Sequence, residues 1–253
     1  MKTAILVTAR LKSTRLPLKA IKMIKDKPMI VHLLDRLKLS QQPESIIICT
    51  SDIRQDDPLE EIAKTQNVKC FRGHPDDVLQ RLTDAARQFG LETIINCTAD
   101  NPFVDPIYID RLLNYHISNN FDYSISCGLP FGTFAYALSY QAMVRACNIK
   151  DEIDTEVWGG YFTDTGLFSH GELYPEESYL QWPELRLTVD TPEDFELITK
   201  IFDALYISGS VFSLQSIINF CRDNPEILKI NSSIRQKKGI PIKVKASYRE
   251  HIE

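Results

Sequence analysis

The stretch Thr3–Lys19, TAILVTARLKSTRLPLK, passes directly from an apolar run into a basic loop. Its residues Ala4–Val7 have the length and the unbroken apolar character of a buried strand. Where a parallel strand ends, backbone N–H groups are exposed at the sheet edge, and cations around them favour a bound polyphosphate. The alternative is a solvated basic face without a ligand. The loop carries four cations, which are Arg10, Lys12, Arg15 and Lys19.

Strand-like and helix-like stretches alternate along the first half of the chain. The apolar runs of strand length are Ala4–Val7, Ile46–Cys49, Val68–Phe71 and Thr93–Cys97. The amphipathic stretches between and after them are Pro28–Leu39, Pro58–Gln66, Asp76–Phe89 and Pro106–Asn119. This alternation predicts an α/β fold with a mostly parallel sheet, helices on both faces and ligands at the carboxyl ends of the strands. Neither GxGxxG nor GxxxxGK[ST] occurs, which argues against a dinucleotide-binding fold and a P-loop ATPase.

The pattern loosens after residue 120, where glycine and proline interrupt shorter apolar runs. We expect a small antiparallel excursion over about residues 120–182, with strands at Tyr123–Cys127, Phe134–Leu138 and Leu167–Leu173. A further strand is predicted at Arg186–Val189, and a helix at Thr191–Leu205 with Pro192 in its first turn. The predicted organisation is a main domain over residues 1–210 and a small helical C-terminal appendage and tail over 211–253.

Composition and charge exclude several classes of protein. Lys and Arg total 29 against 34 Asp and Glu, so the net charge of −5 gives no reason to expect nucleic-acid binding. The N-terminal apolar run is too short for a signal-peptide core or a membrane span, so we expect a cytoplasmic protein without membrane contact. The 6 cysteines are widely spaced without a CxxC pair, which favours buried free thiols.

Several motifs in order resemble the cytidylyltransferases that make CMP-activated sugar acids, most closely the spore coat polysaccharide type. The 3-deoxy-manno-octulosonate and acylneuraminate cytidylyltransferases are similar at a greater distance. The resemblance covers roughly residues 1–230. It rests on Ala9-Arg10, Ser13–Pro17, Lys19 and Lys27–Met29; on Phe71–Gly73, Asp76–Leu79 and Arg81; on Asp100, Pro102 and Asp105-Pro106; on Leu187–Asp194; and on Phe212–Leu214 with Asn224–Glu226.

The resemblance implies a Rossmann-like nucleotide-diphospho-sugar transferase fold, with residues 1–210 as the nucleotidyltransferase domain. It implies transfer of CMP from CTP to a nonulosonic or 3-deoxy sugar acid, release of pyrophosphate, and a role in surface polysaccharide biosynthesis. A homodimer is also implied, and the aromatic segment Tyr136–Phe168 is where we expect the partner surface. The implied catalytic residues are Arg10, Lys19 and Asp100. The implied nucleotide-binding residues are Ala9, Arg10, Ser13, Arg15, Lys19, Arg72, Arg81 and Asp100.

Asp100 and Asp190 each follow an apolar run at the predicted carboxyl end of a strand. Two carboxylates at neighbouring strand ends can hold Mg²⁺ together with triphosphate oxygens, and the resemblance assigns both positions to the metal. The alternative for Asp100 is a turn residue before Asn101-Pro102, and for Asp190 a helix cap before Thr191-Pro192. We assign Asp76 and Asp77 to capping the helix that begins near Val78.

The sequence departs from the family pattern at several positions near the predicted site. Leu18 stands where the family usually has glycine, which restricts the backbone angles of the loop. Phe134 and Tyr136 align with acidic residues of relatives, so we assign them to acceptor binding, the alternative being core packing. Arg186 is the candidate for binding an acceptor carboxylate.

Three other activities remain open at this point. One is a cytidylyltransferase with a phosphorylated or phosphonate acceptor, which gives a CDP-linked product if the acceptor is a phosphate. Another is a glycosyltransferase that uses a nucleotide sugar, although Asp100-Asn101-Pro102 lacks the second carboxylate of a DxD pair. The last is a non-catalytic relative that retains nucleotide binding.

Overall fold

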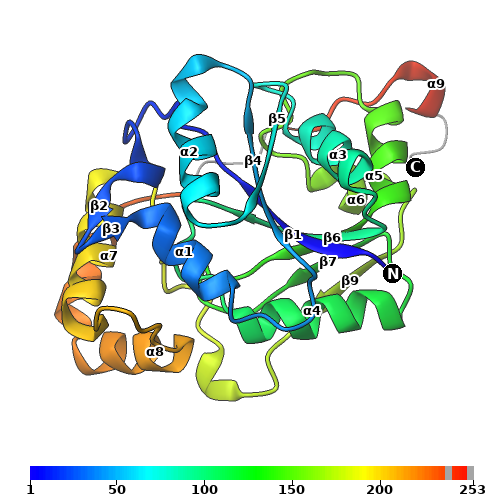
Figure 1. Ribbon diagram of the computed structural model, residues 1–253. Helices are drawn as coiled ribbons and strands as arrows, with labels where there is room; N and C mark the ends of the chain where they lie inside the picture. The colour runs from blue at the N-terminus through cyan, green and yellow to red at the C-terminus, as the bar shows by residue number, and fades with distance from the viewer. Residues whose placement is uncertain (237–240, 250–253) are drawn as a thin grey trace.

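The computed structural model describes residues 1–236 and 241–249, and its central sheet runs through the middle of the molecule (Figure 1). The strand order is β5-β4-β1-β6-β8-β7-β9. The strands are β1 (Thr3–Thr8), β4 (Ile46–Ser51), β5 (Lys69–Gly73), β6 (Thr93–Thr98), β7 (Tyr123–Ser126), β8 (Tyr136–Ser139) and β9 (His170–Leu173). A separate hairpin joins β2 (Met23–Ile24) to β3 (Lys27–Pro28).

The strands predicted in the first half of the chain form the parallel part of the sheet. β1 pairs in parallel with β4 on one side and with β6 on the other, and β4 pairs in parallel with β5. The chain therefore proceeds outward from β1 to β5 and then crosses back to β6. This reversal of strand order places a crevice at the carboxyl ends of β1 and β6, where ligands bind in open α/β sheets.

Helices cover both faces of this sheet, as the sequence predicts (Figure 1). Ile5 and Val7 pack in one core with α1 (Met29–Leu37), α2 (Asp57–Thr65) and α4 (Pro106–Ser118). Ala4 and Leu6 face the other way, into a core with α3 (Val78–Phe89), α5 (Tyr140–Ile149) and α6 (Gly160–Thr163). The alternation along β1 explains why this strand is apolar at every position from Ala4 to Val7: both of its faces are buried. The α/β fold class is confirmed.

The second half of the sheet contains the antiparallel excursion. β8 runs antiparallel to both of its neighbours, β6 and β7, while β7 and β9 are parallel. The strand predicted at Arg186–Val189 is wrong, because this segment forms only an isolated bridge from Arg186 to Phe131. It is nevertheless held extended, since the N–H of Val189 donates to the carbonyl of Asp100 at 2.8 Å. Residue 189 is thereby brought to the end of β6.

A third apolar core lies beyond the sheet and joins α7 (Pro192–Leu205) to α8 (Leu214–Asp223). Met29 at the start of α1 contributes to the same core, so the predicted C-terminal appendage packs onto the main domain. After η4 (Pro225–Lys229) the chain returns to the other side, where Val244 pairs with Lys150 and α9 (Ala246–Arg249) follows. The predicted tail includes residues 237–240 and 250–253, which lie outside the described residues.

No helix within residues 1–236 and 241–249 combines the length and the apolar character that crossing a membrane requires.

Candidate active site

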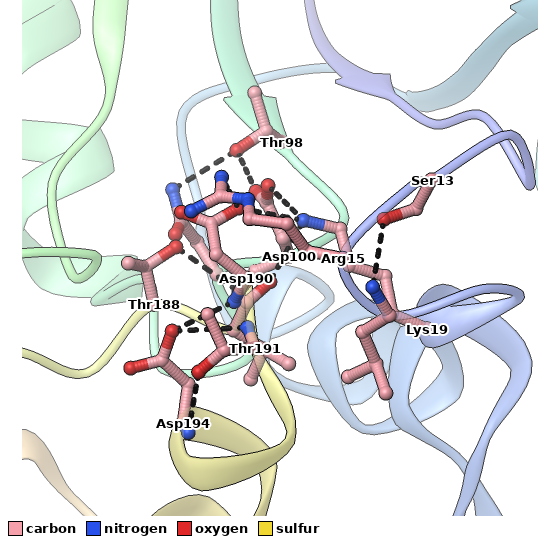
Figure 2. Close-up of polar contacts among 12 residues, drawn as sticks. Ser13, Arg15, Lys19, Thr98, Asp100, Thr188, Asp190, Thr191 and Asp194 are labelled. Atoms are coloured by element: carbon pink, nitrogen blue, oxygen red, sulfur yellow. Dashed lines mark hydrogen bonds and ion pairs between the residues drawn. The ribbon is translucent and has the colours of Figure 1, made fainter. Parts of the chain in front are cut away.

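The basic loop leaves β1 at the crevice and ends at η1 (Lys19–Ile21). Its start is fixed by the fully buried Asp56, whose carboxylate accepts the N–H of Leu11 at 2.7 Å. Its end is fixed by Leu18, which precedes η1 in the left-handed conformation with φ 58° and ψ 22°. Because Leu18 adopts this backbone conformation, Lys19 begins the short helix with its side chain directed at the strand ends (Figure 2).

Leu18 carries a conformational cost that glycine would not carry, at the position where the family resemblance predicts glycine. A residue with a Cβ in the left-handed conformation destabilises the folded state by ~1–2 kcal/mol. Glycine avoids this penalty, but its greater conformational freedom stabilises the unfolded chain by a smaller amount. We expect Leu18→Gly to raise the free energy of unfolding by ~0.5–1 kcal/mol. Chemical denaturation measures this. Leu39→Gly is the control, because Leu39 is also exposed but is not a positive-φ residue. Equal destabilisation by both changes would contradict the prediction.

Asp100 sits just beyond the end of β6, in a turn that fixes one oxygen of its carboxylate. The hydroxyl of Thr98 donates to Asp100 Oδ1, and Asn101 Nδ2 donates to Thr98 Oγ1 at 3.0 Å. The other oxygen, Asp100 Oδ2, accepts a hydrogen bond from Lys19 Nζ at 2.8 Å. Asp100 therefore lies in a turn that aims its carboxylate at the basic loop, and its assignment to the metal stays a prediction.

Asp190 meets the same ammonium group from the other side of the crevice. Lys19 Nζ donates to Asp190 Oδ1 at 3.0 Å and to the carbonyl of Val189 at 2.7 Å (Figure 2). Arg15 lies 3.1 Å from the same Oδ1 atom. The helix cap is Thr191, in a capping box with Asp194, so Asp190 is not the cap. The structure thus brings Arg15, Lys19, Asp100 and Asp190 into one cluster, which we call the Lys19 cluster.

Arg186 holds the far side of the Asp190 carboxylate. Its Nη2 lies 3.0 Å from Asp190 Oδ2, and its Nε and Nη2 each lie 2.9 Å from an oxygen of the buried Asp194. Asn231, which follows η4, donates to Asp194 Oδ1 at 2.9 Å. The guanidinium predicted to bind an acceptor carboxylate is therefore already bound by two carboxylates of its own chain. Its contacts instead fix the orientation of Asp190.

The charges of this region stabilise one another. Burial opposes the charged form of Lys19, but the nearby Asp100 and Asp190 outweigh it and raise the pKa of the ammonium above its ordinary 10.5. Burial likewise works against the Asp190 carboxylate, yet Lys19 and Arg15 lower its pKa. The pKa of Asp194 is also lowered, because hydrogen bonds from Arg186 and Asn231 outweigh the burial of the carboxylate.

The lowered pKa values predict acid sensitivity of the fold. Asp190 and Asp194 contribute stability in full above their ordinary pKa of 3.8, and this contribution is lost as pH falls through the lowered folded-state values. We expect the free energy of unfolding to decrease as pH drops below 3.8, and to do so less steeply in Asp194→Asn. Urea unfolding at a series of acidic pH values measures both slopes. Identical slopes would exclude Asp194 as a source of the acid sensitivity.

Arg10 and Arg81 meet at the loop that precedes α3. Both guanidinium groups donate to the carbonyl of Pro75, and Arg10 also lies 3.2 Å from Asp76 Oδ1. Arg81 is fully buried, and burial together with the charge of Arg10 lowers its pKa to about 10. Its Nε and Nη2 are buried without a hydrogen-bond partner among the described residues. Asp77 caps α3 as predicted, with its side chain accepting from the N–H of Gln80, whereas Asp76, assigned the same role, pairs with Arg10 instead.

The remaining predicted nucleotide-binding residues have contacts of their own. Arg72 pairs with Asp57 at 2.7 Å and with Glu60 at 3.0 Å, so its side chain ties β5 to α2 and is not part of the Lys19 cluster. Ala9 is buried, and its N–H donates to Cys49 across the sheet. The hydroxyl of Ser13 accepts the N–H of Leu16 at 3.3 Å and so shapes the loop.

The two predicted acceptor residues belong to a row of aromatic rings. Phe134 lies 5.6 Å from Phe131 and 5.7 Å from Tyr136, and Tyr136 lies 5.3 Å from Trp158, measured between ring centroids. Both are only partly buried, and both pack against core residues. Burial raises the pKa of Tyr136 to about 12, and the charge of Asp100 contributes in the same direction.

Asp100 and Asp190 suit a hard divalent ion. One oxygen of each lies within 3.0 Å of the same ammonium, so the two carboxylates converge on one cation. Magnesium is bound in proteins by one or two carboxylates plus substrate phosphates and water. Across residues 1–236 and 241–249, no three His, Cys, Asp or Glu side chains gather into a metal-binding group. The pair therefore fits an ion whose other ligands come with a substrate.

Comparison with known proteins identifies the family. Residues 4–215 match the family model described as cytidylyltransferase. The chain belongs to the cytidylyltransferase family. It is a nucleotidyltransferase, and the glycosyltransferase alternative falls away because the family match covers the whole of the Lys19 cluster.

Similar proteins support the same assignment for this cytidylyltransferase. The spore coat polysaccharide biosynthesis protein SpsF of Bacillus subtilis is 28% identical over 228 residues, which is 87% of this chain and 94% of SpsF. The structure of a cytidylyltransferase from Leptospira borgpetersenii has a TM-score of 0.83 and 28% identity, covering 93% of this chain and 100% of that one. CMP:2-keto-3-deoxy-manno-octonic acid synthetase complexed with CTP shares the fold, with a TM-score of 0.62, 17% identity and coverage of 80% and 99%. The predicted family resemblance is confirmed.

Three residues that shape the site of this cytidylyltransferase have no role predicted from the sequence: Thr98, Asp194 and Asn231. Thr98 and Asp194 each contact a predicted metal ligand or the arginine that holds it. Asp194 stands three residues after Thr191, where a capping-box acid is expected, so a local signal existed. Asn231 has no such signal, since it reaches Asp194 only through the packing of α7, α8 and η4.

Proposed function

We propose that this protein is a CTP-dependent cytidylyltransferase that transfers CMP to a sugar acid and releases pyrophosphate. The observation that carries the proposal is the convergence of Asp100 and Asp190 on Lys19 at the crevice between β1 and β6. This arrangement pairs a cationic loop, suited to a triphosphate, with a carboxylate pair, suited to a divalent ion. Family membership supports the choice of CTP as the nucleotide.

The proposed reaction needs alignment and charge neutralisation more than covalent chemistry by the protein. A hydroxyl oxygen of the acceptor attacks the α-phosphorus and forms the new P–O bond. The bond from the α-phosphorus to the bridging oxygen breaks, pyrophosphate leaves with that electron pair, and the hydroxyl proton passes to water. Arg10, Arg15 and Lys19 neutralise the charge that moves onto the phosphate oxygens.

Asp100 and Asp190 would hold a divalent ion, with Mg²⁺ as the proposed species. Bound there, the ion would supply positive charge to the phosphate oxygens. Both carboxylates are oriented by neighbouring side chains, because Thr98 fixes Asp100 and Arg186 fixes Asp190.

The acceptor is proposed to lie against the aromatic row of Phe131, Phe134, Tyr136 and Trp158. The family resemblance supports a sugar acid with a nonulosonic or 3-deoxy skeleton. One observation favours a second candidate: Arg186 is engaged by Asp190 and Asp194 and is not free for an acceptor carboxylate. A phosphorylated or phosphonate acceptor is therefore the alternative substrate class.

A coupled pyrophosphate assay tests the function. The purified protein is given each of the four nucleoside triphosphates with Mg²⁺ and a panel of sugar acids, sugar phosphates and phosphonates. Pyrophosphate release with CTP and a sugar acid is expected, and product mass distinguishes a CMP-linked from a CDP-linked compound. CTP binding without release for every acceptor would support a non-catalytic nucleotide-binding protein and contradict the proposal.

Three further properties belong to the same proposal. The protein is proposed to act in the cytoplasm, in surface polysaccharide biosynthesis, and as a homodimer that uses the segment Tyr136–Phe168. The likeness to SpsF, which is named for spore coat polysaccharide biosynthesis, supports the pathway class. Sedimentation equilibrium of the full chain measures the oligomeric state, and a mass of one chain at every concentration would contradict the dimer.

A further inference from the structure

Lys19 occupies the point at which the two proposed metal ligands converge. Its ammonium donates to Asp100 Oδ2, Asp190 Oδ1 and the carbonyl of Val189, at 2.8, 3.0 and 2.7 Å. An ammonium group has three donors, so Lys19 has none left over for a phosphate oxygen. The side chain that should contact the triphosphate is thus fully engaged by the residues that should contact the ion.

The carboxylates are equally engaged. Asp100 Oδ1 accepts from Thr98, and Asp190 Oδ2 accepts from Arg186 at 3.0 Å. Arg15 adds a second cation at Asp190 Oδ1. All four carboxylate oxygens therefore have a partner within the chain, and an ion bound between Asp100 Oδ2 and Asp190 Oδ1 would take the place of the Lys19 ammonium.

Lys19 is the partner best placed to leave. Arg186 is held at both ends by Asp190 and Asp194, and Thr98 is bonded to Asn101. Lys19, in contrast, is a flexible four-carbon stem on a backbone that Leu18 and η1 hold in place. Among the cations described at the cluster, it is also the one that contacts both Asp100 and Asp190.

We propose that Lys19 is a resident counter-ion that occupies the place of the divalent ion until a triphosphate arrives. This inference rests on the proposed function. When the ion enters, the ammonium moves off the carboxylates and onto the phosphate oxygens. A divalent ion alone competes with a tethered cation and binds weakly, whereas an ion together with a nucleoside triphosphate gives Lys19 a new partner. Ion and nucleotide therefore bind as a coupled pair.

The test measures Mn²⁺ binding to the full chain without nucleotide, by the electron paramagnetic resonance signal of free Mn²⁺. Lys19→Met and Lys19→Gln both remove the charge, and Gln keeps hydrogen-bonding capacity in case Met impairs folding. We expect each variant to bind Mn²⁺ ~10-fold or more tightly than wild type, because the competing cation at the carboxylates is gone. Lys12→Met, an exposed lysine of the same loop, controls for net charge and should leave Mn²⁺ affinity unchanged.

A second measurement, of CTP affinity, should change in the opposite direction to Mn²⁺ affinity. With Mn²⁺ present, CTP should bind the Lys19 variants ~10-fold or more weakly than wild type, because the phosphate oxygens lose their cation. Tighter ion binding with weaker nucleotide binding is the expected signature. Mn²⁺ affinity in Lys19→Met and Lys19→Gln that equals or falls below the wild-type value would overturn the inference.

Asp190→Asn separates this inference from the proposed function. Adding it to Lys19→Met should remove the gain in Mn²⁺ affinity. If the double variant keeps the tight binding, the ion lies elsewhere, and both the counter-ion role and the proposed metal site are wrong. If Asp190→Asn abolishes binding of the Mn²⁺–CTP complex while Lys19→Met leaves Mn²⁺ affinity unchanged, only the counter-ion role is wrong.

Discussion

Asp100→Ala should lower divalent-ion-dependent pyrophosphate release by ~10³-fold or more, because bound-metal charge stabilisation supplies several kcal/mol at the reacting phosphate. Asp100 lies just beyond the end of β6, and its carboxylate accepts a hydrogen bond from the Lys19 ammonium. Removing it leaves Asp190 as the remaining carboxylate of the pair. The measurement is the initial rate of pyrophosphate release from CTP with saturating acceptor, across a Mg²⁺ titration.

Two variants make the Asp100 result interpretable. Asp100→Asn keeps the shape of the side chain and should be impaired nearly as much, since an amide is a poor ligand for the ion. Asp223→Ala removes an exposed carboxylate at the end of α8 and should keep full activity. Full retention of release in Asp100→Ala would refute the metal assignment.

Lys19→Ala should lower turnover by ~10²-fold or more while the protein stays folded. A cation about 4 Å from a phosphate oxygen contributes up to ~4 kcal/mol at an effective dielectric constant of ~20, and Lys19 is mostly buried, so little of this is screened. Steady-state kcat and KM for CTP, with a thermal unfolding curve as the folding check, measure the effect. Lys12→Ala is the matched control, and near-normal kcat in Lys19→Ala would remove Lys19 from the phosphate site.

The Lys19 predictions point in opposite directions for ion binding and for catalysis. Loss of the ammonium is expected to tighten the binding of a free divalent ion and to slow the reaction. A residue with a purely structural role would weaken both. Tighter ion binding together with a slower reaction would therefore show that the Lys19 ammonium competes with the ion for the carboxylates and also serves the reaction.

Local sequence patterns were sufficient for the parallel half of the sheet. Ala4–Val7 and Thr93–Cys97 are continuous apolar runs, and such runs form strands buried on both faces wherever helices follow them. The junction of β1 with the basic loop and the position of Asp100 follow from the same rule. The start of α3 at Asp77 was also predictable, because capping depends on residues within three positions of the cap.

Patterns failed where contacts between distant residues decide the outcome. Arg186–Val189 looks like a strand, but it is paired by Phe131 and Asp100 rather than by a strand of the sheet. Arg72 is assigned to nucleotide binding by the family resemblance, and the structure shows that Asp57 and Glu60 on α2 bind its guanidinium. The partner of a long cationic side chain is set by whichever carboxylate the fold places within reach.

The residue pattern determined the order and type of the elements around the basic loop and the two aspartates. Burial on both faces and helix capping each depend on a few neighbouring residues, so the sequence alone reveals them. The convergence of those aspartates on one ammonium is a consequence of assembly. Lys19, Asp100 and Asp190 are far apart in the chain, and only the pairing of β1 with β6 and the bond from Val189 to Asp100 bring them together. The ion pairs then form because a buried carboxylate without a nearby cation is strongly destabilising, and the fold places Lys19 within reach.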